Sequence, residues 1–157
     1  MTPVELEHYL HTRIPLSKSM GVSAVAVRRD SVVLRAPLAP NINQHETVFG
    51  GSASAIAILA AWSLLHARLH TEGIANRLVI RRNTMEYEHP TASDFTATAS
   101  LEAPDQWPQF IHSLAHKGKA RMVVLSVLEH AGRVTGRLRA EFVALRPTES
   151  LASAAPG

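Results

Sequence analysis

A polar stretch that runs into a glycine pair carries the residues best suited to chemistry. It contains Asn41, Asn43 and Thr47, and Gly50-Gly51 leads directly into the longest apolar segment of the chain. If that segment, Ala53 to Leu69, forms a helix, the backbone N–H groups at its start have no helical acceptors and lie at the positive end of the helix dipole. Such an end can bind an anion or an oxyanion that develops during a reaction.

Each of these residues also has a purely structural interpretation. Asparagines are common in turns, where their side chains bond the neighbouring backbone, and a threonine can cap a helix. A glycine pair can serve only to let a helix approach a sheet closely. His45 and Glu46 complete the stretch, either as an acid or base or as exposed loop residues. The residue types alone leave both interpretations open.

The elements around this stretch predict an α+β domain. Thr2 and Glu5 have the spacing of a capping box, so a helix is expected from Pro3 to about Thr12. Strands are expected at Val22–Arg28, Ser31–Ala36, Arg77–Glu88, Asp94–Leu101, Lys119–Glu129 and Val134–Leu145, and a short helix at Gln109–His116. The imperfect alternation of the third strand indicates a β-bulge or burial on both faces.

One long apolar helix beside a run of strands indicates the hotdog architecture, in which a curved antiparallel sheet wraps around the helix. We expect one such domain at residues 1–147, a disordered tail at 148–157, and pairing of sheet edges in a homodimer or higher assembly. Val48 to Ala67 has no charged residue and is long enough to span a membrane. We interpret it as the buried centre of a soluble fold, with no membrane partner.

The composition excludes several kinds of site. The 157 residues include no cysteine, which removes disulfides, thiolate metal sites and a cysteine nucleophile. The pairs His66/His70 and His112/His116 have the i, i+4 spacing of metal ligands but no third ligand nearby, so no metal and no other cofactor is expected. The first residues lack the features of a signal peptide, which predicts a cytoplasmic protein.

Basic residues occur in small groups, although the net charge is only +3. One of these groups comprises Lys117, Lys119 and Arg121. Such groups are either solvated strand faces or contacts for the phosphates of coenzyme A or for an acidic carrier protein. Nucleic acid is not an expected partner, because the basic groups do not alternate with aromatic residues.

Segments around the glycine pair resemble a known family. Pro37 to Asn43 and Thr47 to Ser52 are similar to a hotdog family long labelled "putative thioesterase", whose members are assigned as malonyl-acyl carrier protein decarboxylases. Glu86 to Pro90 and Lys117 to Arg121 extend the resemblance, which covers roughly residues 5–146.

The resemblance implies roles for individual residues. Asn43 would be the key active-site residue, with Thr47 and the amides of Gly50 and Gly51 completing the site. The neighbours Asn41, His45 and Glu46 would be secondary candidates. The basic group would steer the phosphopantetheine arm of a carrier protein or of coenzyme A, through Lys117, Lys119 and Arg121.

The positions of Asp and Glu residues in the sequence distinguish hydrolysis from decarboxylation at such a site. Hydrolysis of a thioester needs a carboxylate as nucleophile or base, yet no Asp or Glu lies between Thr47 and Thr71. Decarboxylation of a malonyl thioester needs neutral donors for the enolate oxygen instead. The missing carboxylate favours decarboxylation, and the resemblance implies the substrate: we expect a malonyl-acyl carrier protein decarboxylase that forms the acetyl thioester at the initiation of fatty acid synthesis. The alternatives are a thioesterase that uses Glu46 and a non-catalytic module that binds acyl thioesters.

Overall fold

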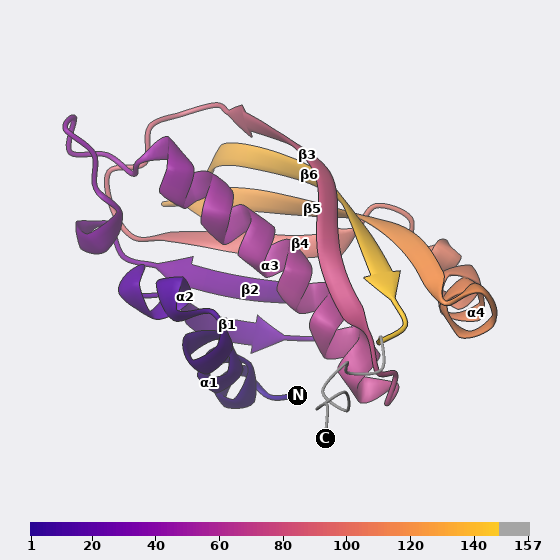
Figure 1. Ribbon diagram of the computed structural model, residues 1–157. Helices are drawn as coiled ribbons and strands as arrows, with labels where there is room; N and C mark the ends of the chain where they lie inside the picture. The colour runs from indigo at the N-terminus through magenta and orange to yellow at the C-terminus, as the bar shows by residue number, and fades with distance from the viewer. Residues whose placement is uncertain (148–157) are drawn as a thin grey trace, which may run out of the picture.

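The computed structural model describes residues 1–147, in which a curved antiparallel sheet wraps around one long helix (Figure 1). The six strands lie in the order β1-β2-β4-β5-β6-β3. Their bounds are β1 Ser23–Val27, β2 Ser31–Ala36, β3 Arg77–Tyr87, β4 Phe95–Leu101, β5 Lys119–His130 and β6 Arg133–Leu145. This is the predicted hotdog architecture, and each predicted strand is present. The tail predicted at 148–157 lies outside the described residues.

Two short helices, α1 (Pro3–Arg13) and α2 (Pro15–Ser19), precede the sheet and lie beside β1 (Figure 1). The predicted capping box is confirmed at the start of α1. Thr2 Oγ1 accepts the Glu5 N–H at 3.2 Å, and Glu5 Oε2 accepts the Thr2 N–H at 2.7 Å. The cap satisfies backbone donors that would otherwise lack acceptors at this end of the helix.

The central helix, α3 (Gly50–Thr71), lies across the concave face of the sheet (Figure 1). It begins at Gly50 and not at the predicted Ala53, so both glycines lie in its first turn. The N-cap residue is Phe49, with no side-chain cap, so Thr47 does not cap the helix. By length and hydropathy α3 could cross a membrane, but 67% of its most apolar window is buried within the fold. The sheet therefore supplies the apolar surroundings of this helix.

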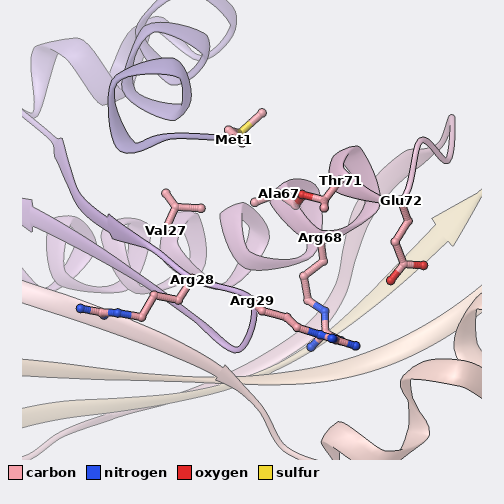
Figure 2. A pocket seen from close by; sticks show the side chains of 8 residues that line it. All are labelled: Met1, Val27, Arg28, Arg29, Ala67, Arg68, Thr71 and Glu72. Carbon is pink, nitrogen blue, oxygen red and sulfur yellow. The ribbon is translucent and has the colours of Figure 1, made fainter.

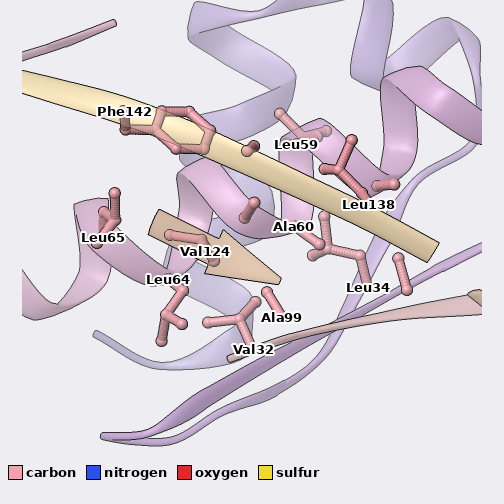
Figure 3. Packing of buried hydrophobic residues seen from close by; sticks show 14 of the residues in the cluster. Val32, Leu34, Leu59, Ala60, Leu64, Leu65, Ala99, Val124, Leu138 and Phe142 are labelled. Carbon is pink, nitrogen blue, oxygen red and sulfur yellow. The ribbon is translucent and has the colours of Figure 1, made fainter. Parts of the chain in front are cut away.

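Side chains of α3 interlock with those of the sheet (Figure 3). Leu64 and Leu65 of α3 are fully buried, as are Val32 of β2, Val124 of β5 and Phe142 of β6 in the same cluster. Because buried apolar surface is the dominant favourable contribution to folding, this layer fixes α3 against the strands. The position of the first turn of α3 follows from that packing.

The edge strand β3 carries the predicted irregularity. It pairs only with β6, and the register shifts between Ile80 and Arg82, so the β-bulge is confirmed. Val79 and Ile80 are 42% and 39% exposed and, with Leu16 of α2, help to line an apolar cavity of about 520 Å³ beside α3. The outer edge of β3 has no strand partner within residues 1–147.

The last helix, α4 (Trp107–Lys117), follows a short 3₁₀ turn, η2 (Pro104–Gln106). It begins two residues before the predicted Gln109, because Trp107 is buried against the C-terminal end of α3. Gly118 ends the helix with a φ of +69°, a left-handed conformation that glycine adopts without strain. The chain then enters β5 at the end of the sheet farther from the start of α3 (Figure 1).

Leu64→Ala should lower the free energy of unfolding by about 2–5 kcal/mol, because it leaves a void in a fully buried layer. The matched control is Val25→Ala on β1. That side chain is 53% exposed, so the free energy of unfolding should change by no more than about 0.5 kcal/mol. Urea unfolding of both variants measures the difference, and equal effects would contradict the described core.

Candidate active site

The Asn43 side chain holds the loop before α3 together. Its Oδ1 accepts the backbone N–H groups of His45 at 2.9 Å and of Thr47 at 3.1 Å, and the Asn43 N–H donates to the Thr47 carbonyl at 2.8 Å. Asparagine favours tight turns closed in this way. Glu46 lies in the turn with a φ of +60° and is exposed, as is His45. The side-chain oxygen of Asn43 therefore has the structural role of closing a turn, whereas its side-chain amide nitrogen takes no part in these bonds.

The amide nitrogen of Asn43 is directed at the Thr47 hydroxyl. Nδ2 donates to Thr47 Oγ1 at 3.0 Å, whereas its contact with the Val48 carbonyl is long, at 3.5 Å. A hydroxyl that accepts a hydrogen bond still has its own proton to donate. That proton can reach Asn43 Oδ1 at 3.2 Å or a bound ligand. Asn43 is thus placed to orient and polarise Thr47.

Asn41 anchors the loop to the rest of the domain. Its side chain is 2% exposed, and Nδ2 donates to the carbonyls of Met20 at 2.9 Å and Pro37 at 2.8 Å. Its own carbonyl accepts the Phe49 N–H at 2.7 Å. Asn41 therefore connects the end of α2, the loop after β2 and the start of α3. Of the two asparagines, Asn41 positions the loop and Asn43 shapes its tip.

The first turn of α3 has backbone donors without acceptors. No residue in the described range 1–147 accepts a hydrogen bond from the N–H groups of Gly50, Gly51 or Ser52. The first backbone bond of the helix runs from the Ala53 N–H to the Phe49 carbonyl at 3.0 Å. No acidic residue lies in this turn. Free donors at the positive end of a long helix form a site suited to anions.

A cavity of about 300 Å³ opens beside this turn. Thr47 and Gly50 line one side of it, and the opposite wall comes from the end of β3 and the turn that follows: Tyr87, Glu88, His89, Pro90 and Thr91. A hydrogen bond from the Val48 N–H to the Thr91 carbonyl, at 2.8 Å, joins the two segments. Gly50 faces the Tyr87 ring. A Cβ added at position 50 would lie 3.6 Å from Tyr87 Cε1.

The predicted residues divide between the wall of this cavity and its surroundings. Thr47 and Gly50 belong to the wall, whereas five others lie outside the set that lines it: Asn41, Asn43, His45, Glu46 and Gly51. Asn43 nevertheless reaches the cavity indirectly through Thr47. Gly51 lies under the exposed Phe49 ring and follows Gly50 in the same turn.

The carboxylate at the cavity is Glu88, a residue to which the sequence reasoning assigned no role. It is 35% exposed and forms an ion pair with Arg137 at 3.2 Å. The neighbouring His89 contacts the Arg133 guanidinium at 3.0 Å. In the sequence, the signal that points to Glu88 is the resemblance of the run Glu86 to Pro90 to the family. Nothing in its local pattern shows that it faces the start of α3.

The basic group predicted to steer phosphopantetheine lies far from this cavity within the chain. Lys117 ends α4, and Lys119 and Arg121 begin β5. Leu128, which lines the cavity, is also on β5, so Arg121 is about 23 Å from it along the strand. The chain therefore does not bring this basic group together with the glycine pair. Arg121 instead lies 3.7 Å from Glu141.

The paired histidines take part in aromatic stacking. The His66 ring lies 4.6 Å from the Trp62 ring and 4.4 Å from the Tyr9 ring, and its Nε2 is buried without a hydrogen-bond partner in the described chain. Burial lowers the pKa of His66, and the neighbouring His70 lowers it further. Residues 1–147 contain no group of three or more His, Cys, Asp or Glu side chains arranged to hold a metal ion.

Known proteins resemble this chain in sequence and in fold. The family model described as "Putative thioesterase (yiiD_Cterm)" matches residues 4–146. A protein of unknown function from Chlorobaculum tepidum TLS shares 25% sequence identity with a TM-score of 0.85, covering 93% of this chain and 98% of that chain. A "putative thioesterase" from Shewanella oneidensis shares 24% identity with a TM-score of 0.78, covering 92% and 97%. A "probable thioesterase" from Pseudomonas aeruginosa shares 20% identity with a TM-score of 0.80, covering 92% and 96%.

Gly51→Ala should disturb the first turn of α3 only while Phe49 is present. A Cβ at position 51 would lie 2.8 Å from Phe49 Cζ and closer still to Cε1, so the ring would have to move. In a Phe49→Ala background the clash is gone, and the higher helix propensity of alanine should raise the free energy of unfolding by about 0.5–1 kcal/mol. Urea unfolding of the four proteins in this double-mutant cycle measures the coupling.

Gly50→Ala is the matched control for that cycle. Its Cβ would make ordinary contact with Tyr87 at 3.6 Å, so its effect should not depend on Phe49. A Gly51→Ala effect that is the same with and without Phe49 would contradict the described packing of the ring over the turn.

Proposed function

Because the chain belongs to the family described as "Putative thioesterase (yiiD_Cterm)", we propose that it is an enzyme that processes acyl thioesters at the N-terminal end of α3. The observation that carries the proposal is the set of backbone donors without acceptors, at Gly50, Gly51 and Ser52, beside a cavity. A thioester carbonyl in that cavity would accept a hydrogen bond from this turn. A donor well aimed at a developing oxyanion contributes about 3 kcal/mol.

The proposed reaction is the decarboxylation of a malonyl thioester to an acetyl thioester. The bond between the carboxylate carbon and the α-carbon breaks, CO₂ leaves, and the electron pair of that bond forms the thioester enolate. One proton from water then converts the enolate to the acetyl group. The protein has to hold the carbonyl oxygen as negative charge develops on it, and it needs no nucleophile of its own.

The distribution of charge around α3 favours this reaction. No Asp or Glu lies between Thr47 and Thr71, so the helix does not repel the carboxylate of the substrate. The apolar residues Val48, Ala53 and Leu128 line part of the cavity. An apolar surround favours loss of a carboxylate as neutral CO₂. In this proposal the substrate is malonyl-acyl carrier protein in the cytoplasm, with malonyl-coenzyme A as the alternative carrier.

Asn43 acts in this proposal through Thr47. Its amide donates to Thr47 Oγ1 at 3.0 Å, which leaves the hydroxyl proton of Thr47 for the substrate carbonyl. The Gly50 N–H, on the wall of the same cavity, is the second donor. Chains of hydrogen bonds polarise one another, so Asn43 strengthens the donor that Thr47 presents. The carbonyl would thus lie between a hydroxyl and a backbone N–H.

Hydrolysis of an acyl thioester is the second candidate function, and Glu88 is the observation that favours it. Its carboxylate is on the wall of the cavity, where a general base could activate water. Glu46, the base expected from the sequence, is exposed on the loop and does not line the cavity. Arg137 already holds the Glu88 carboxylate at 3.2 Å. A base role would therefore require this ion pair to loosen.

We also propose that two copies of the chain pair through β3. The outer edge of this strand has no partner in residues 1–147, and unpaired edges invite strand addition. The apolar cavity beside it exposes Leu16, Val79 and Ile80 at 60%, 42% and 39%. A second copy would cover both the edge and these side chains.

Two substitutions separate decarboxylation from hydrolysis. Thr47→Val removes the hydroxyl but keeps the side-chain shape, so conversion of malonyl-carrier protein to the acetyl form should slow by about 10²-fold. Glu88→Gln should leave that rate within a few-fold. Mass spectrometry of the carrier protein distinguishes the acetyl product from free carrier thiol. Thr12→Val, on the exposed face of α1, is the matched control.

The opposite pattern would overturn the proposed reaction. If the product is free carrier thiol and Glu88→Gln abolishes its formation, the protein is a hydrolase. If neither product forms from malonyl- or acyl-thioesters although they bind, it is a non-catalytic binding module. Asn43→Asp adds a further check, because it keeps the acceptor for His45 and Thr47 but removes the donor, and it should lose decarboxylation while retaining the fold.

Ile80→Asp should convert the dimer into monomers, because it puts a charge among the apolar side chains beside β3. Val25→Asp is the matched control on β1, the opposite edge of the sheet, where the side chain is 53% exposed. Sedimentation equilibrium of the wild type and the control should give twice the chain mass of 17.1 kDa. A monomeric wild type, or a dimer that only Val25→Asp disrupts, would rule out pairing through β3.

A further inference from the structure

A second cavity, of about 400 Å³, lies at the C-terminal end of α3 (Figure 2). Its wall combines the end of α3 with the β1–β2 turn and the first residue of the chain: Met1, Val27, Arg28, Arg29, Ala67, Arg68, Thr71 and Glu72. It shares no lining residue with the cavity at Gly50. Along the helix axis, Arg68 is about 27 Å from Gly50.

Arg68 is a buried cation without an ion-pair partner among residues 1–147. It is 9% exposed, and its guanidinium forms no salt bridge or side-chain hydrogen bond within residues 1–147. It stacks instead on the Trp107 ring, 4.0 Å from the ring centroid. Stacking fixes the plane of the guanidinium, while a buried positive charge that lacks a partner is costly. The Arg68 guanidinium is therefore held in a fixed orientation, and a bound anion would stabilise its positive charge.

A second guanidinium converges on the first. Figure 2 shows Arg29, from the β1–β2 turn, reaching to Arg68, whereas Arg28 extends away from them. Burial lowers the pKa of Arg68, and the positive charge of Arg29 lowers it further. The carboxylates of Glu72 and Asp30 act in the opposite direction and raise this pKa. Glu72 accepts the Trp107 Nε1–H at 2.5 Å, which turns its carboxylate to the indole.

We infer that this cavity is a second ligand site, which binds a small molecule bearing a phosphate group and does so independently of the thioester site. Two guanidinium groups at one cavity are best neutralised by a dianion, and the oxygens of a phosphate match the fork geometry of arginine. Met1, Val27 and Ala67 add an apolar wall for an organic group attached to the phosphate. Burial of Arg68 inside a cavity favours a small molecule over a flat protein surface.

Isothermal titration calorimetry with three probes tests this site. Inorganic phosphate and pyrophosphate present the anion alone, and phenyl phosphate adds an apolar group for the Met1, Val27 and Ala67 wall. The wild type should bind phenyl phosphate more tightly than inorganic phosphate. Arg29→Gln should weaken binding of each probe by about tenfold or more, through loss of one charge-assisted contact. Arg29 is exposed, so this variant should fold even if Arg68→Gln does not.

Arg35→Gln is the matched control. It removes the same charge from the neighbouring strand β2, where Arg35 is exposed and pairs with Asp94 at 2.6 Å, and it should leave binding unchanged. The inference is overturned if the wild type binds none of the probes, or if Arg29→Gln binds them as tightly as the wild type. Displacement of phenyl phosphate by the malonyl thioester of N-acetylcysteamine, which carries no phosphate group, would show one shared site and would also overturn it. The readout is binding alone, so it does not depend on the proposed reaction.

Discussion

The wrapping of a curved sheet around α3 is the constraint on which the rest of the structure depends. A helix enclosed on most sides must be apolar, since a buried carboxylate without a partner is costly. The helix accordingly contains no acidic residue from Gly50 to Thr71. The two proposed sites lie at its two ends, each beside a cavity. At the first end the protein offers backbone donors, and at the other end it offers arginines.

The same constraint decides where acid–base groups can come from. The helix itself contributes no carboxylate, and the two titratable side chains that line the cavity at Gly50, Glu88 and His89, come from the end of β3 and the turn after it. The loop before α3 leaves the backbone N–H groups of the first helical turn uncovered. Asn41 ties it to Met20 and Pro37 through hydrogen bonds, and Asn43 folds its tip. The glycines of the first turn leave the helix end open beside Tyr87 and Phe49.

Patterns within short segments could be predicted from the sequence, and contacts between distant segments could not. The capping box at Thr2, the six strands and the β-bulge near Ile80 follow from spacing and alternation. Spacing also predicts that the glycine pair stands at the start of a long helix, and the structure places both glycines in the first turn of α3. By contrast, the placement of Thr47 and Glu88 on the wall of one cavity depends on how far β3 runs before it turns. Linear order also does not reveal which end of the sheet receives Lys117 and Lys119, or that Trp107 closes over Arg68.

The central claim, that the first turn of α3 holds the thioester carbonyl, is tested most directly by NMR. A ¹H–¹⁵N spectrum would be recorded with a malonyl-carrier protein analogue in which an amide replaces the thioester. If this turn holds the carbonyl, the amide protons of Gly50 and Gly51 should move downfield on saturation, as expected when free N–H groups gain an acceptor. An analogue that binds and perturbs other residues while these two resonances stay unchanged would show that the first turn of α3 does not hold the carbonyl.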